Sequence, residues 1–352
     1  MSEQPTDAVR DSALDLLVVG AGPTGLATAI EAQKAGFRVA LVDKGCVCNS
    51  IFHYPAHMTF FTTAERLEIG GIPFPSTNAK PGRGEALEYY RQVAAYYRLN
   101  VHQYHRVESV TGSDGAFTVH TVDRFGRPGK LKARKLAIST GYYDLPNWMD
   151  IPGETLSKVL HYYHDPHPYY GMDVAVIGGK NSAAIAALEL WRSGARVTLI
   201  YRGPGVTPNV KYWIKPDIEN RIKDGEIKAY FSTEVVEITL DAVVVDSPTG
   251  RVTLPNDFVF AMTGYHPDFA FLEKVGVRFQ GEDRLPVCDP ETLESNVPGI
   301  YLAGVIVAGS RTSEIFIENG RFHGKQIAAS LISKIKPQNE LQDSVAASNS
   351  ID

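Results

Sequence analysis

The sequence predicts an α/β fold in which one nucleotide-binding unit is interrupted by a second. A strand, a glycine-rich turn, a helix and another strand follow one another within residues 14–44. The same order recurs within residues 173–202. After each unit, an apolar strand closes on the dipeptide Thr-Gly, first at Thr140-Gly141 and then at Thr263-Gly264. This repetition predicts two Rossmann-like dinucleotide-binding domains.

The first unit has its glycines and its acid at the expected places. Gly20 allows a tight turn, Gly22 lets the backbone approach a pyrophosphate, and Gly25 lets the helix pack closely on the strand. The helix 26–35 directs its N-terminal N–H groups and partial positive charge at the phosphates. Asp43 lies about 20 residues further on, where a carboxylate accepts hydrogen bonds from an adenosine ribose. The alternative is a glycine-rich turn without a ligand.

The second unit departs from this pattern at two points. Its turn, Gly178 to Ala183, has Lys180 in place of the middle glycine, which either tolerates the backbone geometry or adds a charge near the phosphates. Its second strand ends in Tyr201-Arg202 rather than in an acid, and an arginine there favours a 2′-phosphate. Two different nucleotide folds predict two cofactors, a flavin and a nicotinamide, that carry the chemistry. A second αβ unit without a ligand is the alternative.

The remaining apolar patterns predict further elements. Helices are expected at 85–97 and 215–224, and a last helix at 313–332. Strands are expected at 101–107, 116–123, 130–133, 135–138, 227–231, 234–240, 242–246, 251–254, 258–262 and 299–303. The polar residues 1–13 and the tail 338–352 are expected to be disordered.

Composition excludes several classes of function. The net charge is −5 without a long basic run, which disfavours nucleic acid and anionic membranes as partners. No apolar stretch reaches the ~18 residues of a membrane span, and the polar start of the chain does not read as a signal peptide. Three cysteines, at 46, 48 and 288, do not form a disulfide framework. We therefore expect a cytoplasmic protein.

Motifs along the chain, most of them outside the two units, carry a family resemblance. They include Asn49-Ser50-Ile51 with Tyr54-Pro55, Thr59-Phe60-Phe61, Arg66 to Gly70, Ala86 to Arg91, Thr140 to Asp144, Gly178 to Ala183, Tyr201-Arg202-Gly203, Phe258 to Asp268 and Glu314 to Gly324. With them, the chain resembles the thioredoxin-reductase-like branch of the two-dinucleotide-binding flavoproteins. More narrowly, it resembles the bacillithiol disulfide (bacilliredoxin) reductases. The resemblance implies FAD on the first fold, NADPH on the second, and a homodimer or homotetramer.

The resemblance also implies roles for single residues. For FAD these are Gly20, Gly22 and Gly25 at the pyrophosphate, Asp43 at the ribose, Thr140 and Gly141 at the adenine, Gly304 at the phosphates and ribityl chain, and Glu314 and Ile315 at the flavin's pyrimidine edge. For NADPH they are Asn181, Ser182 and Ala183 at the pyrophosphate and Arg202 at the 2′-phosphate, with Lys211 as a further candidate. The implied binding set is completed by Pro23, Thr24, Lys44, Asn49, Ser50, His57, Val107, Gly178, Lys180, Tyr201, Thr263 and Gly264.

The implied domains are discontinuous. The FAD-binding domain would comprise residues 1–157 and 268–337, and the NADPH-binding domain residues 158–267.

Two positions depart from the family pattern. Gly304 is followed by Val305, where many such FAD enzymes have an aspartate on the ribityl chain. In the resembled reductases, the first motif reads G-x-G-P-C-G, with the cysteine as the proposed working thiol. Thr24 occupies that place here, and a hydroxyl cannot form a mixed disulfide.

Other reactive residues offer weaker candidates. Cys46-Val47-Cys48 lacks the C-x-x-C spacing, so it is interpreted either as a strained, reducible pair or as two packed thiols. Cys288 is interpreted as structural. The run His161 to His167 suggests a metal site, but it lacks an adjacent helical ligand pair, which favours a segment between domains. No catalytic residue is assigned.

Three classes of function remain. The first is an NADPH-dependent FAD oxidoreductase that passes electrons to a low-molecular-weight disulfide, a redoxin or a ferredoxin- or flavodoxin-type carrier. The second is a flavin monooxygenase. The third is a redox sensor that binds FAD and reports NADPH levels.

Overall fold

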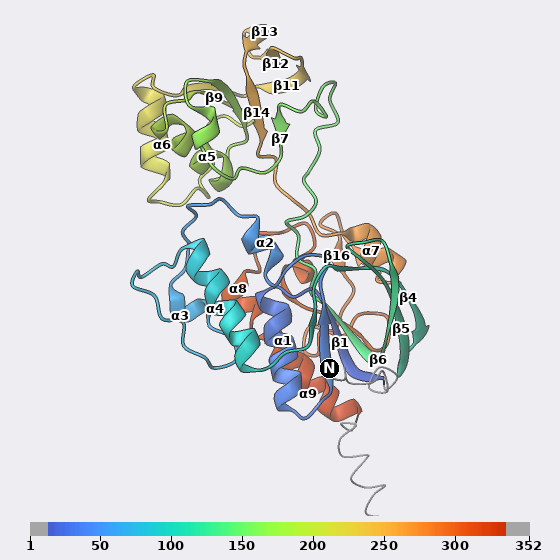
Figure 1. The fold of residues 1–352 in the computed structure, drawn as a ribbon. Helices are drawn as coiled ribbons and strands as arrows, with labels where there is room; N and C mark the ends of the chain where they lie inside the picture. Colours follow the sequence, from blue (N-terminus) through green and yellow to red (C-terminus); the bar gives the residue numbers. More distant parts are fainter. Residues whose placement is uncertain (1–12, 336–352) are drawn as a thin grey trace, which may run out of the picture. The chain divides into compact units, whose positions relative to one another are not determined.

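The computed structural model describes residues 13–335 and divides them into two compact units (Figure 1). The first contains the described residues of Met1–Phe52, Thr59–Leu145 and His266–Asp352. The second contains His53–Met58 and Pro146–Tyr265. Residues 1–12 and the tail 338–352, both expected to be disordered, lie outside the described residues. The cofactor-domain boundaries expected from the sequence stay a prediction.

The first unit contains a seven-stranded sheet among its described residues, in the order β3-β2-β1-β6-β5-β4 with β17 also paired to β6. The strands are β1 (Leu14–Val19), β2 (Val39–Val42), β3 (Val101–His102), β4 (His105–Ser113), β5 (Ala116–Asp123), β6 (Pro128–Ile138) and β17 (Ile300–Leu302). The apolar strand β1 is buried because it pairs in parallel with both β2 and β6.

The long strand β6 corrects the sequence-based expectation of two strands at 130–133 and 135–138. Residues Pro128 to Ala133 pair antiparallel with β5, and Ala133 to Ile138 pair in parallel with β1. One strand therefore joins the antiparallel hairpin to the parallel part of the sheet.

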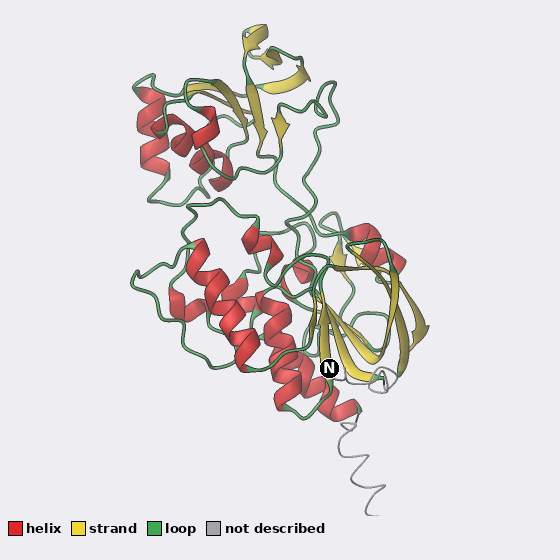
Figure 2. Cartoon of the chain, viewed as in Figure 1, coloured by secondary structure: helices red, strands yellow, loops and turns green. Residues whose placement is uncertain are grey.

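Helices pack on this sheet in one group (Figure 2). They are α1 (Pro23–Lys34), α2 (Asn49–Phe52), α3 (Ala64–Leu67), α4 (Arg83–Tyr96), α8 (Ile317–Gly320) and α9 (His323–Lys334). The unit also contains α7 (Phe269–Lys274), the turn η3 (Gly304–Ala308) and a hairpin of β15 (Phe279–Gln280) and β16 (Leu285–Pro286). A β-carbon at Gly324 would lie 2.8 Å from the Ala27 carbonyl oxygen, so this glycine lets α9 approach α1.

The last helix differs from the expected single helix at 313–332. It is broken into α8 and α9 at Arg321 and Phe322. Asn319 helps to set the start of α8, because its side-chain oxygen accepts from Phe316 N at 2.7 Å and its amide donates to the Glu314 carbonyl at 2.9 Å.

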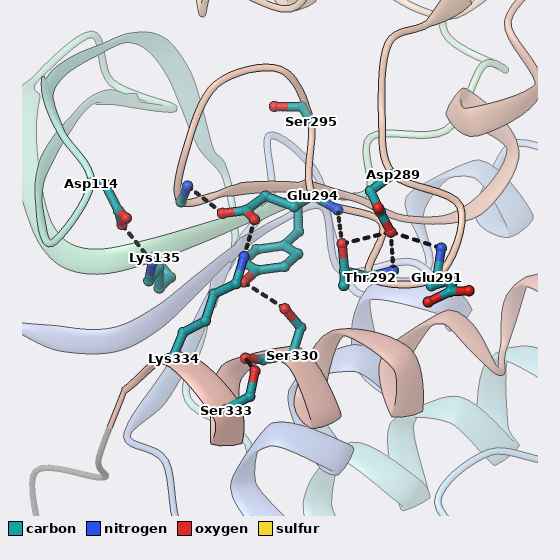
Figure 3. Close-up of polar contacts among 12 residues, drawn as sticks. Asp114, Lys135, Asp289, Glu291, Thr292, Glu294, Ser295, Ser330, Ser333 and Lys334 are labelled. Carbon is teal, nitrogen blue, oxygen red and sulfur yellow. Dashed lines mark hydrogen bonds and ion pairs between the residues drawn. The ribbon is translucent and has the colours of Figure 1, made fainter.

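Polar contacts fasten the end of α9 to β17 and to the loop before it (Figure 3). Lys334 pairs with Glu294, whose other carboxylate oxygen accepts from Gly299 N at 2.8 Å. The hydroxyls of Tyr301 and Ser330 lie 3.1 Å apart in the same cluster. The last helix is therefore held to the sheet by one buried and two more exposed polar contacts as well as by apolar packing.

The second unit has a parallel five-stranded sheet, in the order β10-β9-β8-β14-β7. Its strands are β7 (Val159–Leu160), β8 (Asp173–Ile177), β9 (Arg196–Tyr201), β10 (Lys228–Phe231) and β14 (Phe258–Ala261). The unit also holds α5 (Asn181–Arg192), α6 (Lys215–Lys223), the turn η2 (His167–Tyr169) and an antiparallel sheet of β11 (Glu234–Ile238), β12 (Ala242–Ser247) and β13 (Gly250–Pro255). Because the five strands are parallel, their carboxyl ends meet at one edge.

Candidate cofactor sites

The first glycine turn is closed by Asp43. One carboxylate oxygen of Asp43 accepts from Ala21 N at 2.7 Å, and the other accepts from Gly45 N at 2.8 Å. Burial raises the pKa of this carboxyl, while the two N–H donors oppose the rise. The carboxylate at the end of β2 is thus fixed beside the turn that follows β1, where the sequence predicts the adenosine ribose.

Two glycines of this turn are required by close packing. Gly20 has a φ of +107°, and a β-carbon there would lie 2.3 Å from the Ser139 carbonyl oxygen. A β-carbon at Gly25 would lie 2.0 Å from the Gly20 carbonyl oxygen. Side chains at either place would force the turn, α1 and β6 apart.

Gly22, unlike Gly20 and Gly25, has open space where a β-carbon would lie, and this space tests whether a nucleotide fits. It is the residue before α1, and a β-carbon built on it meets nothing within 4 Å. The protein therefore leaves open space at the helix start, where unpaired N–H groups attract a phosphate. Thr140 provides a second sign, because its Oγ1 is buried without a hydrogen-bond partner among the described residues. These features fit FAD.

Thr24 lies where α1, the turn after β17 and α8 converge. A β-carbon at Gly304 would be 3.4 Å from the Thr24 Oγ1, and one at Gly320 would be 3.2 Å from it. Gly304 N donates to His323 Nδ1 at 3.0 Å, which fixes this ring nitrogen as an acceptor. Burial lowers the pKa of His323, which favours the neutral imidazole.

His323 was not singled out from the sequence. The sequence nevertheless contained a signal for His323. Gly304 lacks the aspartate that often follows it, so another polar group was needed there, and the motif Glu314 to Gly324 contains His323 next to its last glycine.

The segment after Asp43 returns to the same turn. Cys48 N donates to the Ala21 carbonyl at 2.9 Å, and Lys44 pairs with Asp144 at 3.0 Å. Asn49 and Ser50 begin α2, and the Asn49 side chain packs on Gly45. Lys44 and Asn49, two of the predicted FAD residues, thus lie beside Asp43 and its partner Gly45.

None of the three cysteines is prepared for thiol chemistry. All are free, and Cys48 is only 1% exposed. Burial raises the pKa of the Cys46 and Cys288 thiols and raises that of Cys48 well above its usual value. Because the thiolate is the nucleophile, these thiols are poorly reactive near neutral pH.

Other predicted FAD residues are more scattered. Glu314 pairs with Arg311 at 3.0 Å, and the Ile315 side chain packs on Gly320. Val107, on β4, packs on the core of the first unit. His57 is 72% exposed and lies 3.5 Å from Asp165, within the second unit, and its role at FAD stays a prediction.

The second glycine turn lies at the carboxyl edge of the parallel sheet. A β-carbon at Gly178 would lie 2.7 Å from the Met262 carbonyl oxygen. The Tyr201 ring packs on Gly179 and on Gly203. Lys180 precedes α5, Ser182 is exposed and Ala183 is buried. Tyr201 therefore covers the turn rather than projecting from it.

Asn181 links this turn to the loop 203–211. Its Oδ1 accepts from Lys211 N at 2.9 Å, and its Nδ2 donates to the Asn209 carbonyl at 3.3 Å. Arg202 is exposed directly after β9 and forms no ion pair with any residue of the described range 13–335. Two cations of the predicted NADPH set thus lie at the two ends of one loop.

Thr263 and Gly264 follow β14 and bind the linker before β7. Thr263 Oγ1 donates to the Asn147 carbonyl at 2.6 Å, and Asn147 N donates to the Gly264 carbonyl at 2.9 Å.

The histidine-rich run packs within the second unit. His164 O accepts from Ala56 N at 2.8 Å, which attaches residues 53–58. His161 is packed against Trp148 and lies 3.7 Å from Glu154, with neither ring nitrogen hydrogen-bonded in the described structure. No group of three or more His, Cys, Asp or Glu suited to a metal ion occurs within residues 13–335. Over the same range, no helix has the length and apolar character needed to span a bilayer.

Comparison with known proteins identifies the family. Residues 17–304 match the model of the pyridine nucleotide-disulphide oxidoreductases. The chain is 46% identical over 321 residues to a bacilliredoxin reductase of Bacillus subtilis (strain 168), covering 90% of this chain and 97% of that protein. The solved bacillithiol disulfide reductase of Bacillus cereus is 46% identical, with a TM-score of 0.90 over 92% of this chain and 100% of that one.

A more distant structure confirms the architecture. The thioredoxin reductase of T. acidophilum is 24% identical, with a TM-score of 0.71, and the match covers 91% of this chain and 98% of that one. The predicted thioredoxin-reductase-like fold and the resemblance to bacillithiol disulfide reductases are thus confirmed. The chain belongs to the pyridine nucleotide-disulphide oxidoreductase family, as an oxidoreductase whose cofactors are FAD and NADPH.

Proposed function

We propose that this protein takes electrons from NADPH and passes them to a small redox partner without using a protein thiol. The observation that carries the proposal is the position of Thr24, packed at Gly304 and Gly320 where the resembled reductases have their cysteine. The partly buried thiol of Cys46 and the buried thiol of Cys48, whose pKa values are both raised by burial, offer no substitute.

The residues of the first unit would bind FAD and set its position. Gly22 and the start of α1 would receive the pyrophosphate, Asp43 the adenosine ribose and Thr140 the adenine side. Bound FAD would accept a hydride from NADPH and return two electrons to an acceptor. In the second unit, the start of α5 would receive the NADPH pyrophosphate, and Arg202 the 2′-phosphate. We place the domain boundaries at 157/158 and 267/268.

Two chemical classes of electron acceptor are considered. The names of the relatives favour a low-molecular-weight disulfide or a redoxin, in which the S–S bond breaks and takes up two electrons and two protons. Thr24 favours an acceptor that takes electrons directly, such as a ferredoxin- or flavodoxin-type carrier. We therefore expect little native activity with bacillithiol disulfide.

A gain of function tests this assignment. Thr24→Cys places a thiol at the position that the reductases use, and a cysteine fits a place already occupied by a branched side chain. NADPH oxidation should be measured with bacillithiol disulfide, flavodoxin and a dye. The variant should gain disulfide reduction while keeping dye activity. Fast native reduction of bacillithiol disulfide, unchanged in the variant, would contradict the proposal.

Assembly and location are also proposed. We infer a cytoplasmic homodimer or homotetramer, in keeping with the resemblance. Light scattering of the FAD-loaded protein would measure the assembly, and a monomer across micromolar concentrations would refute it.

A further inference from the structure

The loop 203–211 is fastened to the phosphate turn of the second unit. Thr207 donates to the Gly179 carbonyl from its backbone N at 3.1 Å and from its hydroxyl at 3.0 Å. Asn181 holds the far end of the loop, through Lys211 N and the Asn209 carbonyl. The turn and the loop therefore form one hydrogen-bonded structure.

These bonds change the role that the sequence assigns to Asn181. A side-chain amide offers an oxygen acceptor and two N–H donors, and the loop engages the oxygen and one of the N–H donors here. The backbone N–H groups at the start of α5, which are unpaired in any helix, are available to the pyrophosphate. The Asn181 side chain acts on the loop instead.

The loop carries charge at both ends. Arg202 is exposed directly after β9, where the adenosine 2′-phosphate of a bound NADPH is expected. Lys211 is brought back to the start of α5 by its backbone bond to Asn181. A lysine stem is long and flexible, so fixing its backbone narrows the region that its ammonium group can reach.

We propose that Asn181 is a positioning residue, whose side chain fixes the loop 203–211 so that Lys211 joins Arg202 in binding the 2′-phosphate of NADPH. The proposal rests on the NADPH-binding role proposed for the second unit and adds the device that sets its selectivity. The proposal assigns the Asn181 side chain to selectivity for the 2′-phosphate rather than to binding of the pyrophosphate, which NADPH and NADH share.

Ligand binding to the FAD-loaded protein tests the proposal without turnover. Calorimetry would compare 2′,5′-ADP, which carries the 2′-phosphate, with 5′-ADP, which lacks it. A hydrogen bond to a charged group is worth about tenfold or more in affinity. Asn181→Ala and Lys211→Ala should each weaken 2′,5′-ADP by about that factor and leave 5′-ADP nearly unchanged.

The double variant identifies the route of the effect. If Asn181 acts through Lys211, Asn181→Ala with Lys211→Ala should lose no more than Lys211→Ala alone. Additive losses, or an equal weakening of both ligands by Asn181→Ala, would overturn the proposal. In turnover, Asn181→Ala should raise KM for NADPH and leave kcat in place.

Two controls separate this proposal from the function on which it rests. Asn220→Ala removes an exposed asparagine of α6 in the same unit and should change neither affinity. Arg202→Ala should reduce the preference for 2′,5′-ADP. If the native protein shows no such preference, the NADPH role of the second unit fails. A native preference that Asn181→Ala preserves overturns only the positioning role.

Discussion

The backbone N–H of Gly304 donates to Nδ1 of His323 at 3.0 Å, joining the turn after β17 to the first residue of α9. Gly304 also packs on Thr24. One histidine thus helps to hold the turn that the family resemblance assigns to the phosphates and ribityl chain. The bond requires an unprotonated Nδ1, so it depends on the charge of His323.

Acidification should therefore loosen FAD. Burial lowers the pKa of His323 from the ordinary 6.5, so the unfolded chain takes up this proton first. The stability contributed by the neutral ring is fully present above pH 6.5 and is lost as the pH falls through the folded pKa. Flavin fluorescence should report FAD release over that window.

His323→Asn provides the matched control for this pH dependence. Its side-chain oxygen can accept from Gly304 N but does not titrate, so this step in FAD release should shrink. Asp43, whose pKa is raised by burial, is present in both proteins, so its contribution to the pH profile should be the same in both. An unchanged profile in His323→Asn would show that His323 does not control retention.

Gly22→Val should remove FAD without unfolding the protein. A β-carbon at this position meets nothing within 4 Å, so the added side chain fills only the space reserved for the pyrophosphate. The purified variant should be colourless, while circular dichroism should retain the native secondary structure. Gly84→Val, at an exposed glycine whose β-carbon also meets nothing, should stay yellow. Retention of FAD by Gly22→Val would refute the site.

Arg202→Ala should change the choice between nicotinamide cofactors. A hydrogen bond to a charged group contributes about 1.5–3 kcal/mol, so the variant should weaken NADPH roughly tenfold to a hundredfold. NADH, which lacks the 2′-phosphate, should be nearly unaffected. Stopped-flow reduction of the flavin would measure both, with Arg251→Ala, an exposed arginine paired with Asp246, as the control. Equal native preference for the two nucleotides would disprove the assignment.

The Cys-Val-Cys loop should be dispensable for electron transfer. Cys48 lies beside Ala21, at the turn bound by Asp43, and burial raises the pKa of its thiol. A Cys46→Ser/Cys48→Ser variant should keep its NADPH–dye activity, with Cys48→Ala in place of Cys48→Ser if the buried hydroxyl destabilises the fold. If the native enzyme reduces a disulfide and the double variant does not, this loop is the active site.

Sequence patterns predicted correctly the features that are set by residues close together in the chain. The glycines at 20, 22 and 25 and the acid at 43 are set by one turn and two neighbouring strands, and the structure brings them together. The apolar spacing likewise located α1, expected at 26–35 and found at Pro23–Lys34, to within a few residues.

Long-range contacts account for what the sequence did not predict. The bond between Asn181 and Lys211 N spans 30 positions, and the bond between Gly304 and His323 depends on where α9 packs. His57 and Asp165, whose side chains lie 3.5 Å apart, are still further apart in the sequence. No periodicity encodes such contacts, because each is decided by the packing of separate elements.

The pairing of β6 has a consequence for how the chain folds during synthesis. Leu136 to Ile138 pair with β1 on one side and with β17, at Ile300 to Leu302, on the other. The ribosome must therefore translate Pro146 to Tyr265 before the last strand of the first sheet exists. The second unit, whose other segment His53–Met58 is translated earlier still, is complete in sequence first. Nascent chains stalled soon after Tyr265 should thus protect the second unit from proteolysis while the first sheet still awaits β17.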